Sequence, residues 1–242
     1  MLSKKEIKDI QSLGHKKYRD ELGLFVAEGP KIIHELRQLV PSMIEKIYAT
    51  AEWLNANEQG NNLIYELVDP SELARLSHLQ TPNQVLAVVK QFDNREPVAS
   101  GFFLYLDTIQ DPGNLGSIIR IADWFNIQGI VCSSGCADRY NPKVIQATMS
   151  SIARVSIYED LDGTWLQKQK LPLFAATLNG NSLYGHAKIK EGILIIGNES
   201  KGINKAILDQ ASEFITIPKK GEAESLNAAV ATGILMSHLI PQ

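Results

Sequence analysis

The stretch Phe102-Phe-Leu-Tyr-Leu-Asp-Thr-Ile-Gln-Asp-Pro-Gly-Asn-Leu-Gly-Ser-Ile-Ile-Arg120 predicts a strand followed by a helix. An unbroken apolar run ends at Asp107, and a turn that contains Pro112 and Gly113 follows it. Beyond the turn, apolar residues recur at helical spacing up to Phe125. An apolar run without alternation is typical of a strand in a parallel sheet that is buried on both faces.

The same alternation of short apolar runs and amphipathic segments extends along the whole chain. In the first part we expect strands at Leu24–Glu28, Ile44–Ala49, Leu63–Val68 and Val85–Lys90, with helices at Pro30–Leu39 and from Pro70. In the second part we expect strands at Phe102–Asp107, Gly129–Ser133, Arg154–Tyr158, Leu173–Thr177, Ile193–Gly197 and Phe214–Ile217. Helices are expected from about Asn114, from Pro142 with Asn141 as its cap, and from Ser225 to about Leu239.

The stretch Gln91–Ser100 is polar, contains Pro97 and has no periodicity, so it reads as a linker. We therefore expect an α/β fold made of two α/β domains, residues 1–95 and 96–242.

The charge balance excludes a uniformly basic nucleic-acid-binding protein. The 242 residues carry 24 Lys and Arg against 27 Asp and Glu, a net charge of −3. The first twenty residues nevertheless have a local charge of +3, because three acidic residues, Glu6, Asp9 and Asp20, stand against six basic ones: Lys4, Lys5, Lys8, Lys16, Lys17 and Arg19. RNA contact therefore remains open for this segment, whose alternative interpretation is a solvated helix face.

Cysteine and histidine usage indicates a reduced protein without a metal. Cys132 and Cys136 make no disulfide framework and have a poor zinc spacing, and the five histidines are scattered. The chain has no signal-like start and no apolar run near 20 residues, so we expect a cytoplasmic protein with no membrane partner.

Ligands of open α/β sheets bind beyond the carboxyl ends of strands, and three predicted strand ends here combine polar residues with glycine. After the first, Gly116 and Arg120 share one helix face, where Arg120 could hold a phosphate. The alternative is a surface arginine that pairs with Asp123 or Asp111.

The second strand end is followed by Gly197-Asn-Glu-Ser-Lys-Gly202, and the third by a loop that runs from Ile217 to Asn227. Gly197 would let a ligand approach the backbone, and free N–H groups near Ser225 would favour an anion. The alternatives are a simple turn capped by Asn198 or Ser200, and a plain N-cap at Ser225.

Together and in this order, the three segments resemble the SpoU (TrmH-like) branch of the SPOUT RNA methyltransferases. The motif Asn-x-Gly-x-x-x-Arg is met by Asn114, Gly116 and Arg120, and Gly-Asn-Glu-x-x-Gly by residues 197–202. Ile-Pro followed by Ser-Leu-Asn is met by the residues Ile217, Pro218, Ser225, Leu226 and Asn227. In the family's intermediate helix, Gln146 and Ser150 stand where a basic residue and a glycine are expected.

Residues 1–95 are similar to the RNA-binding module that often precedes this domain and resembles a large-subunit ribosomal protein. The similarity rests on Ser12-Leu13, Lys16-Lys17, Arg19 and Phe25-Val26-x-Glu28-Gly29.

The resemblance implies methyl transfer from S-adenosylmethionine (SAM) to a ribose 2′-hydroxyl of RNA, with rRNA expected before tRNA. It also implies a C-terminal SPOUT domain with a parallel sheet and a trefoil knot, acting as a homodimer. The implied catalytic group is Asn114, Arg120, Glu199, Ser225 and Asn227. The implied cofactor-binding positions, mostly through backbone, are Thr177, Leu178, Ile196, Gly197, Ile217 and Leu226. The expected RNA contacts are Lys16, Lys17, Arg19, Lys219 and Lys220.

Arg120 is expected to stabilise the developing oxyanion, because a guanidinium normally keeps its protons, although a role as base stays open. A second hypothesis is a catalytically inactive RNA-binding ribosome-assembly factor. A third, a nucleotide-binding oxidoreductase, lacks its Gly-x-Gly-x-x-Gly fingerprint.

Overall fold

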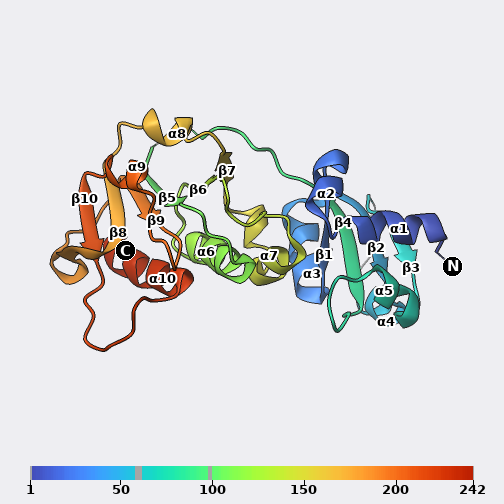
Figure 1. Ribbon diagram of the computed structural model, residues 1–242. Coiled ribbons are helices and arrows are strands. Elements are labelled where there is room, and N and C mark those ends of the chain that lie inside the picture. The colour runs from blue at the N-terminus through green and yellow to red at the C-terminus, as the bar shows by residue number, and fades with distance from the viewer. Residues whose placement is uncertain (1, 58–61, 98–99, 242) are drawn as a thin grey trace. The chain divides into compact units, whose positions relative to one another are not determined.

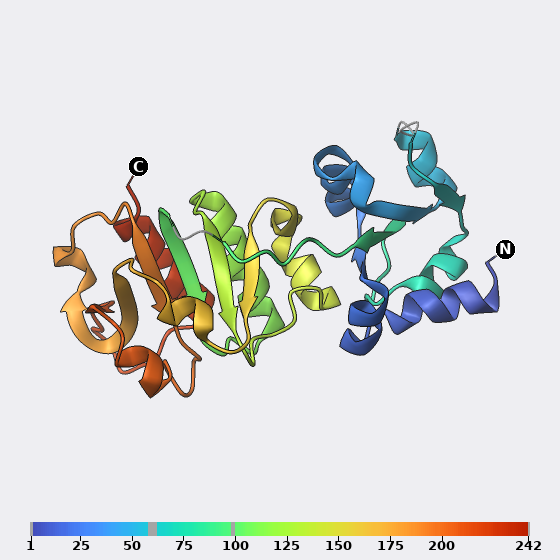
Figure 2. The same ribbon diagram turned by 90° about the horizontal axis from the view of Figure 1, so that it is seen from above.

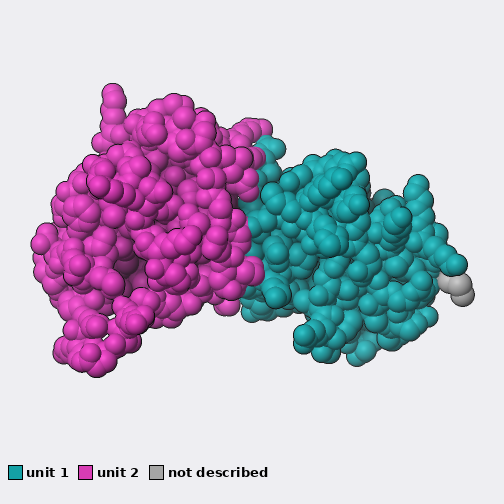
Figure 3. Space-filling view, in the orientation of Figure 1, with its two compact units in different colours: residues 1–93, 138–153 teal, residues 94–137, 154–242 magenta. Residues whose placement is uncertain are grey.

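The computed structural model describes residues 2–57, 62–97 and 100–241 (Figures 1 and 2). The chain forms two compact units, residues 1–93 with 138–153 and residues 94–137 with 154–242 (Figure 3). The predicted domains divide the chain once, after residue 95. In the structure, the segment 138–153 belongs to the first unit, although it lies within the predicted second domain. Among the described helices, none has both the length and the apolar character needed to span a membrane.

The first unit is built on a four-stranded sheet in the order β1-β4-β2-β3. Strand β4 pairs antiparallel with β1 and β2, and β3 pairs parallel with β2. The strands are β1 (Leu24–Glu28), β2 (Ile44–Ala49), β3 (Tyr65–Leu67) and β4 (Val85–Lys90). The helices of this unit are α1 (Lys4–Ser12), α2 (Lys16–Leu22), α3 (Pro30–Leu39), α4 (Ala51–Ala56), α5 (Pro70–Leu76) and α7 (Pro142–Thr148).

Arg19 belongs to the interior of this unit. Its side chain is 2% exposed, its guanidinium forms an ion pair with Asp138, and it donates a hydrogen bond of 2.7 Å to the carbonyl oxygen of Leu13. A buried guanidinium that is held in this way cannot reach a phosphate. The prediction that Arg19 contacts RNA is therefore wrong, because its partner, 119 residues away, is invisible to local sequence analysis.

Three more contacts join the segment 138–153 to the first unit. The rings of Phe25 and Tyr140 stack with centroids 4.9 Å apart. Gln146 donates to the carbonyl oxygen of Glu28 at 2.9 Å, and the buried Ser150 hydroxyl donates to the backbone of α3 at 3.3 Å. Ser150 has a φ of +77°, which explains why glycine is the residue expected there. Both departures from the family pattern thus serve packing within this unit.

The second unit contains a six-stranded, wholly parallel sheet in the order β10-β8-β9-β5-β6-β7. Its strands are β5 (Phe102–Leu106), β6 (Gly129–Ser133), β7 (Ile157–Asp160), β8 (Leu173–Ser182), β9 (Gly192–Ile196) and β10 (Glu213–Thr216). Its helices are α6 (Pro112–Trp124), α8 (Thr164–Gln167), α9 (Lys205–Leu208) and α10 (Ala228–Leu239). The α/β fold class and the parallel sheet are as predicted.

The difference from the predicted elements that bears most on the site is at the start of α10. Helix α10 begins at Ala228 and not at Ser225, because the side-chain oxygen of Asn227 accepts hydrogen bonds from the N–H groups of Ala229 (3.0 Å) and Val230 (3.2 Å). Asn227 is therefore the N-cap, and Ser225 lies in the preceding loop.

The buried ion pair generates a prediction for the stability of the first unit. Replacing Arg19 by Ala leaves the Asp138 carboxylate buried without its cation, so we expect a loss of about 3–5 kcal/mol. The loss is measured by native-state hydrogen exchange at the amides of β1 and β4. Replacing Asp138 as well should recover part of it. The exposed neighbour Lys16, replaced by Ala, should cost no more than about 0.5 kcal/mol. A loss of stability on replacing Arg19 that is as small as the loss on replacing Lys16 would show that the buried ion pair does not stabilise the first unit.

Candidate functional site

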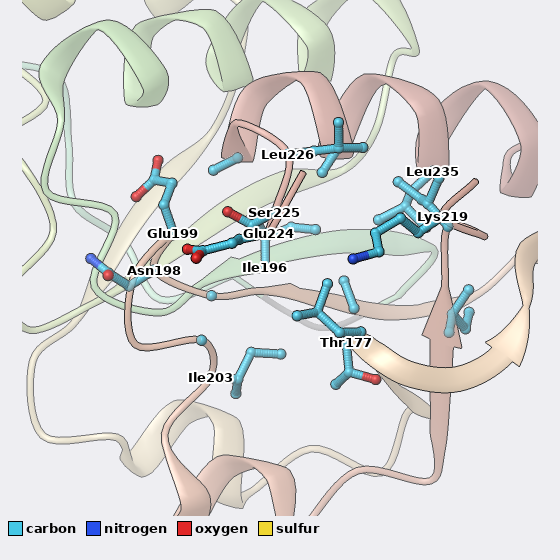
Figure 4. Close-up of a pocket in the computed structure, with 18 of the residues that line it drawn as sticks. Thr177, Ile196, Asn198, Glu199, Ile203, Lys219, Glu224, Ser225, Leu226 and Leu235 are labelled. Atoms are coloured by element: carbon cyan, nitrogen blue, oxygen red, sulfur yellow. The ribbon is translucent and has the colours of Figure 1, made fainter. Parts of the chain in front are cut away.

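A cavity of about 670 Å³ lies at the carboxyl ends of β9 and β10 and beside the middle of β8, and the first turns of α10 cover it (Figure 4). The loops that follow β9 and β10 form most of its wall. The structure brings to this cavity all six predicted cofactor-binding residues, which are Thr177, Leu178, Ile196, Gly197, Ile217 and Leu226. Two of the predicted catalytic residues, Glu199 and Ser225, also line it.

The loop after β9 owes its shape to Gly197 and Asn198. A Cβ at position 197 would lie 2.5 Å from the backbone of Gly202, so only glycine allows the loop to close this tightly. The Asn198 side chain accepts hydrogen bonds from the N–H groups of Ser200 (2.9 Å) and Lys201 (3.1 Å). The proposed capping role of Asn198 is thus real, but it organises a cavity wall.

Asn114 joins the three motifs through its side-chain amide. Its Nδ2 donates to the carboxylate of Glu199, and its Oδ1 accepts a hydrogen bond of 2.6 Å from Nδ2 of Asn227. Asn227 in turn caps α10. One continuous chain of hydrogen bonds therefore fixes the helix α6, the loop after β9 and the start of α10 relative to one another.

Asp107, which is not among the predicted site residues, holds the segment after β9 in place through hydrogen bonds. Its carboxylate is 4% exposed and accepts hydrogen bonds from the backbone of Asn204 (2.6 Å), from the Ser133 hydroxyl (3.2 Å) and from the hydroxyl of Thr108 (3.0 Å). The side-chain amide of Asn198 adds a second link between the two segments by donating to the Thr108 carbonyl oxygen at 3.0 Å. A carboxylate at a strand end was visible in the sequence, but its backbone partner 97 residues away was not.

Arg120 stands apart from this chain of hydrogen bonds. It is exposed on α6, does not line the cavity, and makes no hydrogen bond or ion pair with any residue that the structure describes. Asp123 instead pairs with Arg154 at 2.8 Å, and Asp111 caps α6. The alternative of a surface arginine paired with Asp111 or Asp123 is therefore wrong.

The lysines expected to contact RNA lie in two places. Lys219 and Lys220 are exposed and line the cavity, together with Lys201. Lys16 and Lys17 are exposed on α2 in the first unit, where Lys16 pairs with Asp20 at 3.1 Å.

Both cysteines are free thiols that do not line the cavity: Cys132 is buried in β6, and Cys136 follows that strand. Hydrogen bonding from Cys132 lowers the pKa of the Cys136 thiol, and the N–H of Ile109 also donates to its sulfur, at 3.3 Å. Across residues 2–57, 62–97 and 100–241, no group of three or more His, Cys, Asp and Glu side chains could hold a metal ion.

Comparison with protein families identifies two modules. The model of the SpoU rRNA Methylase family matches residues 101–237, and that of the MRM3-like substrate binding domain matches residues 4–87. The first match spans more than half of the chain and contains all three motifs.

Similar proteins cover nearly the whole chain. A Bacillus subtilis (strain 168) protein named 23S rRNA (guanosine(2553)-2'-O)-methyltransferase RlmP is 27% identical over 238 residues, 97% of this chain and 95% of that protein. A Porphyromonas gingivalis structure assigned to the TrmH family of RNA methyltransferases is 35% identical, with a TM-score of 0.88 over 99% of this chain and 98% of that one. An AdoMet-bound rRNA methyltransferase from Sinorhizobium meliloti is 28% identical, with a TM-score of 0.84 over 99% and 96% of the two chains.

The hydrogen-bond chain through Asn114 generates a prediction about Asn227. Replacing Asn227 by Ala removes both the cap of α10 and the bond to Asn114, so we expect a loss of about 2–3 kcal/mol and faster hydrogen exchange in the first turn of α10. Asn204 caps α9 by the same type of bond (2.9 Å to the N–H of Ala206) without touching Asn114. Replacing Asn204 by Ala should therefore cost only the cap, about 1 kcal/mol. Equal losses in the two variants would show that the bond to Asn114 contributes nothing.

Proposed function

The chain belongs to the SpoU rRNA methylase family and is a SAM-dependent RNA methyltransferase, and we propose that it methylates a ribose 2′-hydroxyl of ribosomal RNA. The observation that carries the proposal is the chain of hydrogen bonds from Glu199 through Asn114 to Asn227, at the edge of a ligand-sized cavity. It joins side chains from all three motifs, which are dispersed over about 115 residues of sequence.

The residues of the cavity fit SAM. Its volume of about 670 Å³ lies within the range of ~300–1,000 Å³ that is usual for small-ligand sites. Apolar residues such as Ile196 and Leu226 would hold the adenine, and backbone groups near Thr177 and Gly197 would bind its polar edge. Lys219 supplies a cation for the methionine carboxylate. SAM when bound supplies a methyl group on a positively charged sulfur.

The residues of this chain would prepare the ribose. A hydroxyl is a weak nucleophile until its proton is removed or shared. A ribose would be held against one edge of the cavity. Glu199 and Ser225 line this edge, and hydrogen bonds link Glu199 through Asn114 to Asn227. Arg120, which keeps its charge, would stabilise the oxyanion that develops at the 2′-oxygen and would bind a neighbouring phosphate.

A homodimer is part of the proposal. Helix α10 is apolar around its whole circumference, yet Val230 is 51% exposed, and Trp124 at the end of α6 is 85% exposed. An apolar helix with an exposed face is typical of an interface between subunits. The exposed surface of α6 also carries Arg120.

Three finer features stay within the proposal. The trefoil knot rests on the family resemblance, and the cytoplasmic location rests on composition. We favour rRNA over tRNA because a relative that matches 97% of this chain is named as a 23S rRNA enzyme. The alternative, an inactive assembly factor, is disfavoured by the presence of every motif side chain.

Replacing Arg120 by Ala should reduce methyl transfer to rRNA by about 10²–10³-fold, the usual cost of removing one oxyanion donor. The measurement is transfer of labelled methyl from SAM to rRNA from a strain that lacks this protein, followed by mapping of 2′-O-methylated positions. SAM affinity, measured by calorimetry, should not change, because Arg120 does not line the cavity. Arg120→Lys should recover activity only partly, because it restores the charge without the bidentate fork. Unchanged transfer by Arg120→Ala would contradict this role.

The lysines of α2 give a second prediction. Replacing Lys16 and Lys17 by Ala should weaken RNA binding and lower the slope of log K against log salt by about 1–2, because each phosphate contact contributes ~0.7–0.9. The matched control replaces Lys168 and Lys170, two exposed lysines of the second unit, and should leave the slope unchanged. If both pairs change the slope equally, the effect reflects total charge and not a site on α2.

A further inference from the structure

Five ionisable side chains line the cavity, and of its two carboxylates one forms no hydrogen bond or ion pair with the residues that the structure describes. The five are Glu199, Lys201, Lys219, Lys220 and Glu224. The Glu199 carboxylate is engaged by Asn114. Glu224, which the sequence analysis did not select, is exposed and forms no hydrogen bond or ion pair with the residues that the structure describes. Its negative charge is therefore available to a ligand.

The Glu224 carboxylate and the Lys219 ammonium group lie in different parts of the cavity. Figure 4 shows the Glu224 carboxylate directed toward the end of the cavity where Asn198 and Glu199 lie, while the Lys219 ammonium group lies nearer to Thr177. The Glu199 end is also the end to which the hydrogen bonds from Asn114 attach the motif side chains. A negatively charged group thus lies on the side from which a methyl group would leave.

We propose that Glu224 is the residue by which this site distinguishes SAM from its demethylated product, S-adenosylhomocysteine (SAH). The inference rests on the proposed function. SAM carries a fixed positive charge on sulfur, and SAH carries none there, while the two molecules share the adenosine and amino-acid parts. A group that senses the sulfonium charge can therefore separate them, and Glu224 supplies the complementary sign.

The net charge of the lining supports this role. Three lysines against two glutamates give the cavity wall a formal charge of +1, and without Glu224 the wall would carry +2. A wall with a charge of +2 would weaken the binding of SAM, whose sulfur is positively charged. It would not act on the neutral sulfur of SAH. Because the cavity is open to water, screening limits the effect to that of a partly exposed ion pair, about three- to tenfold in affinity.

The same loop contains a matched control. Glu222 lies two residues before Glu224, is also exposed, and is absent from the cavity wall. Glu222→Gln removes the same charge from the same loop, so any effect of total charge or of loop stability acts in both variants. Only the effect of a charge inside the cavity is specific to Glu224→Gln.

The test measures the Kd of three ligands by calorimetry for the wild-type protein and both variants. The ligands are SAM, SAH and sinefungin, an analogue that carries an ammonium group in place of the sulfonium methyl. We expect Glu224→Gln to raise the Kd of SAM and of sinefungin by about three- to tenfold and to change the Kd of SAH by less than about twofold. Glu222→Gln should leave all three unchanged.

The outcomes separate the inference from the proposed function. Equal weakening of SAM and SAH by Glu224→Gln, or no weakening of either, would overturn the role of Glu224 while leaving the enzyme assignment intact. The same holds if Glu222→Gln reproduces the selective loss. Failure of the wild-type protein to bind SAM at all would instead overturn the proposed function.

Discussion

The hydrogen bonds of the Asn114 side chain are the constraint on which the site depends. An amide has a donor and an acceptor on one planar group, so it can bind a carboxylate and a second amide at the same time. Here it binds Glu199 on one side and Asn227 on the other. Aspartate or leucine of similar size could satisfy only one side or neither. This junction brings together three motifs that lie far apart in the sequence.

The rest of the second unit provides the frame for that junction. The parallel sheet brings the carboxyl ends of β9 and β10 and the middle of β8 together, and Asp107 anchors the loop after β9 through the backbone of Asn204. Glycine at 197 is required because the loop folds back on itself within contact distance. These parts leave a cavity whose walls are mostly backbone and apolar side chains, with charge at its edges. Such a cavity suits a cofactor that is recognised by shape and by one fixed charge.

The sequence predicted the features that local patterns encode. Buried strands were recognised from apolar runs, and the six positions around the cavity were implied by the family resemblance. What it could not predict are pairings across long separations. Arg19 looked like one cation in a basic segment, but Asp138 holds it inside the first unit. Asp107 and Glu224 carried no motif, and only their positions in three dimensions give them a role.

The central claim is that the three motifs, joined by Asn114, build a SAM site at the ends of β9 and β10 and beside the middle of β8. A crystal structure of the protein grown with SAM tests it most directly. We predict density for the cofactor in this cavity, with its sulfur on the side of Glu199 and Glu224 and its carboxylate toward Lys219. SAM bound elsewhere on the chain, or bound with its sulfur at the Thr177 side, would contradict the account.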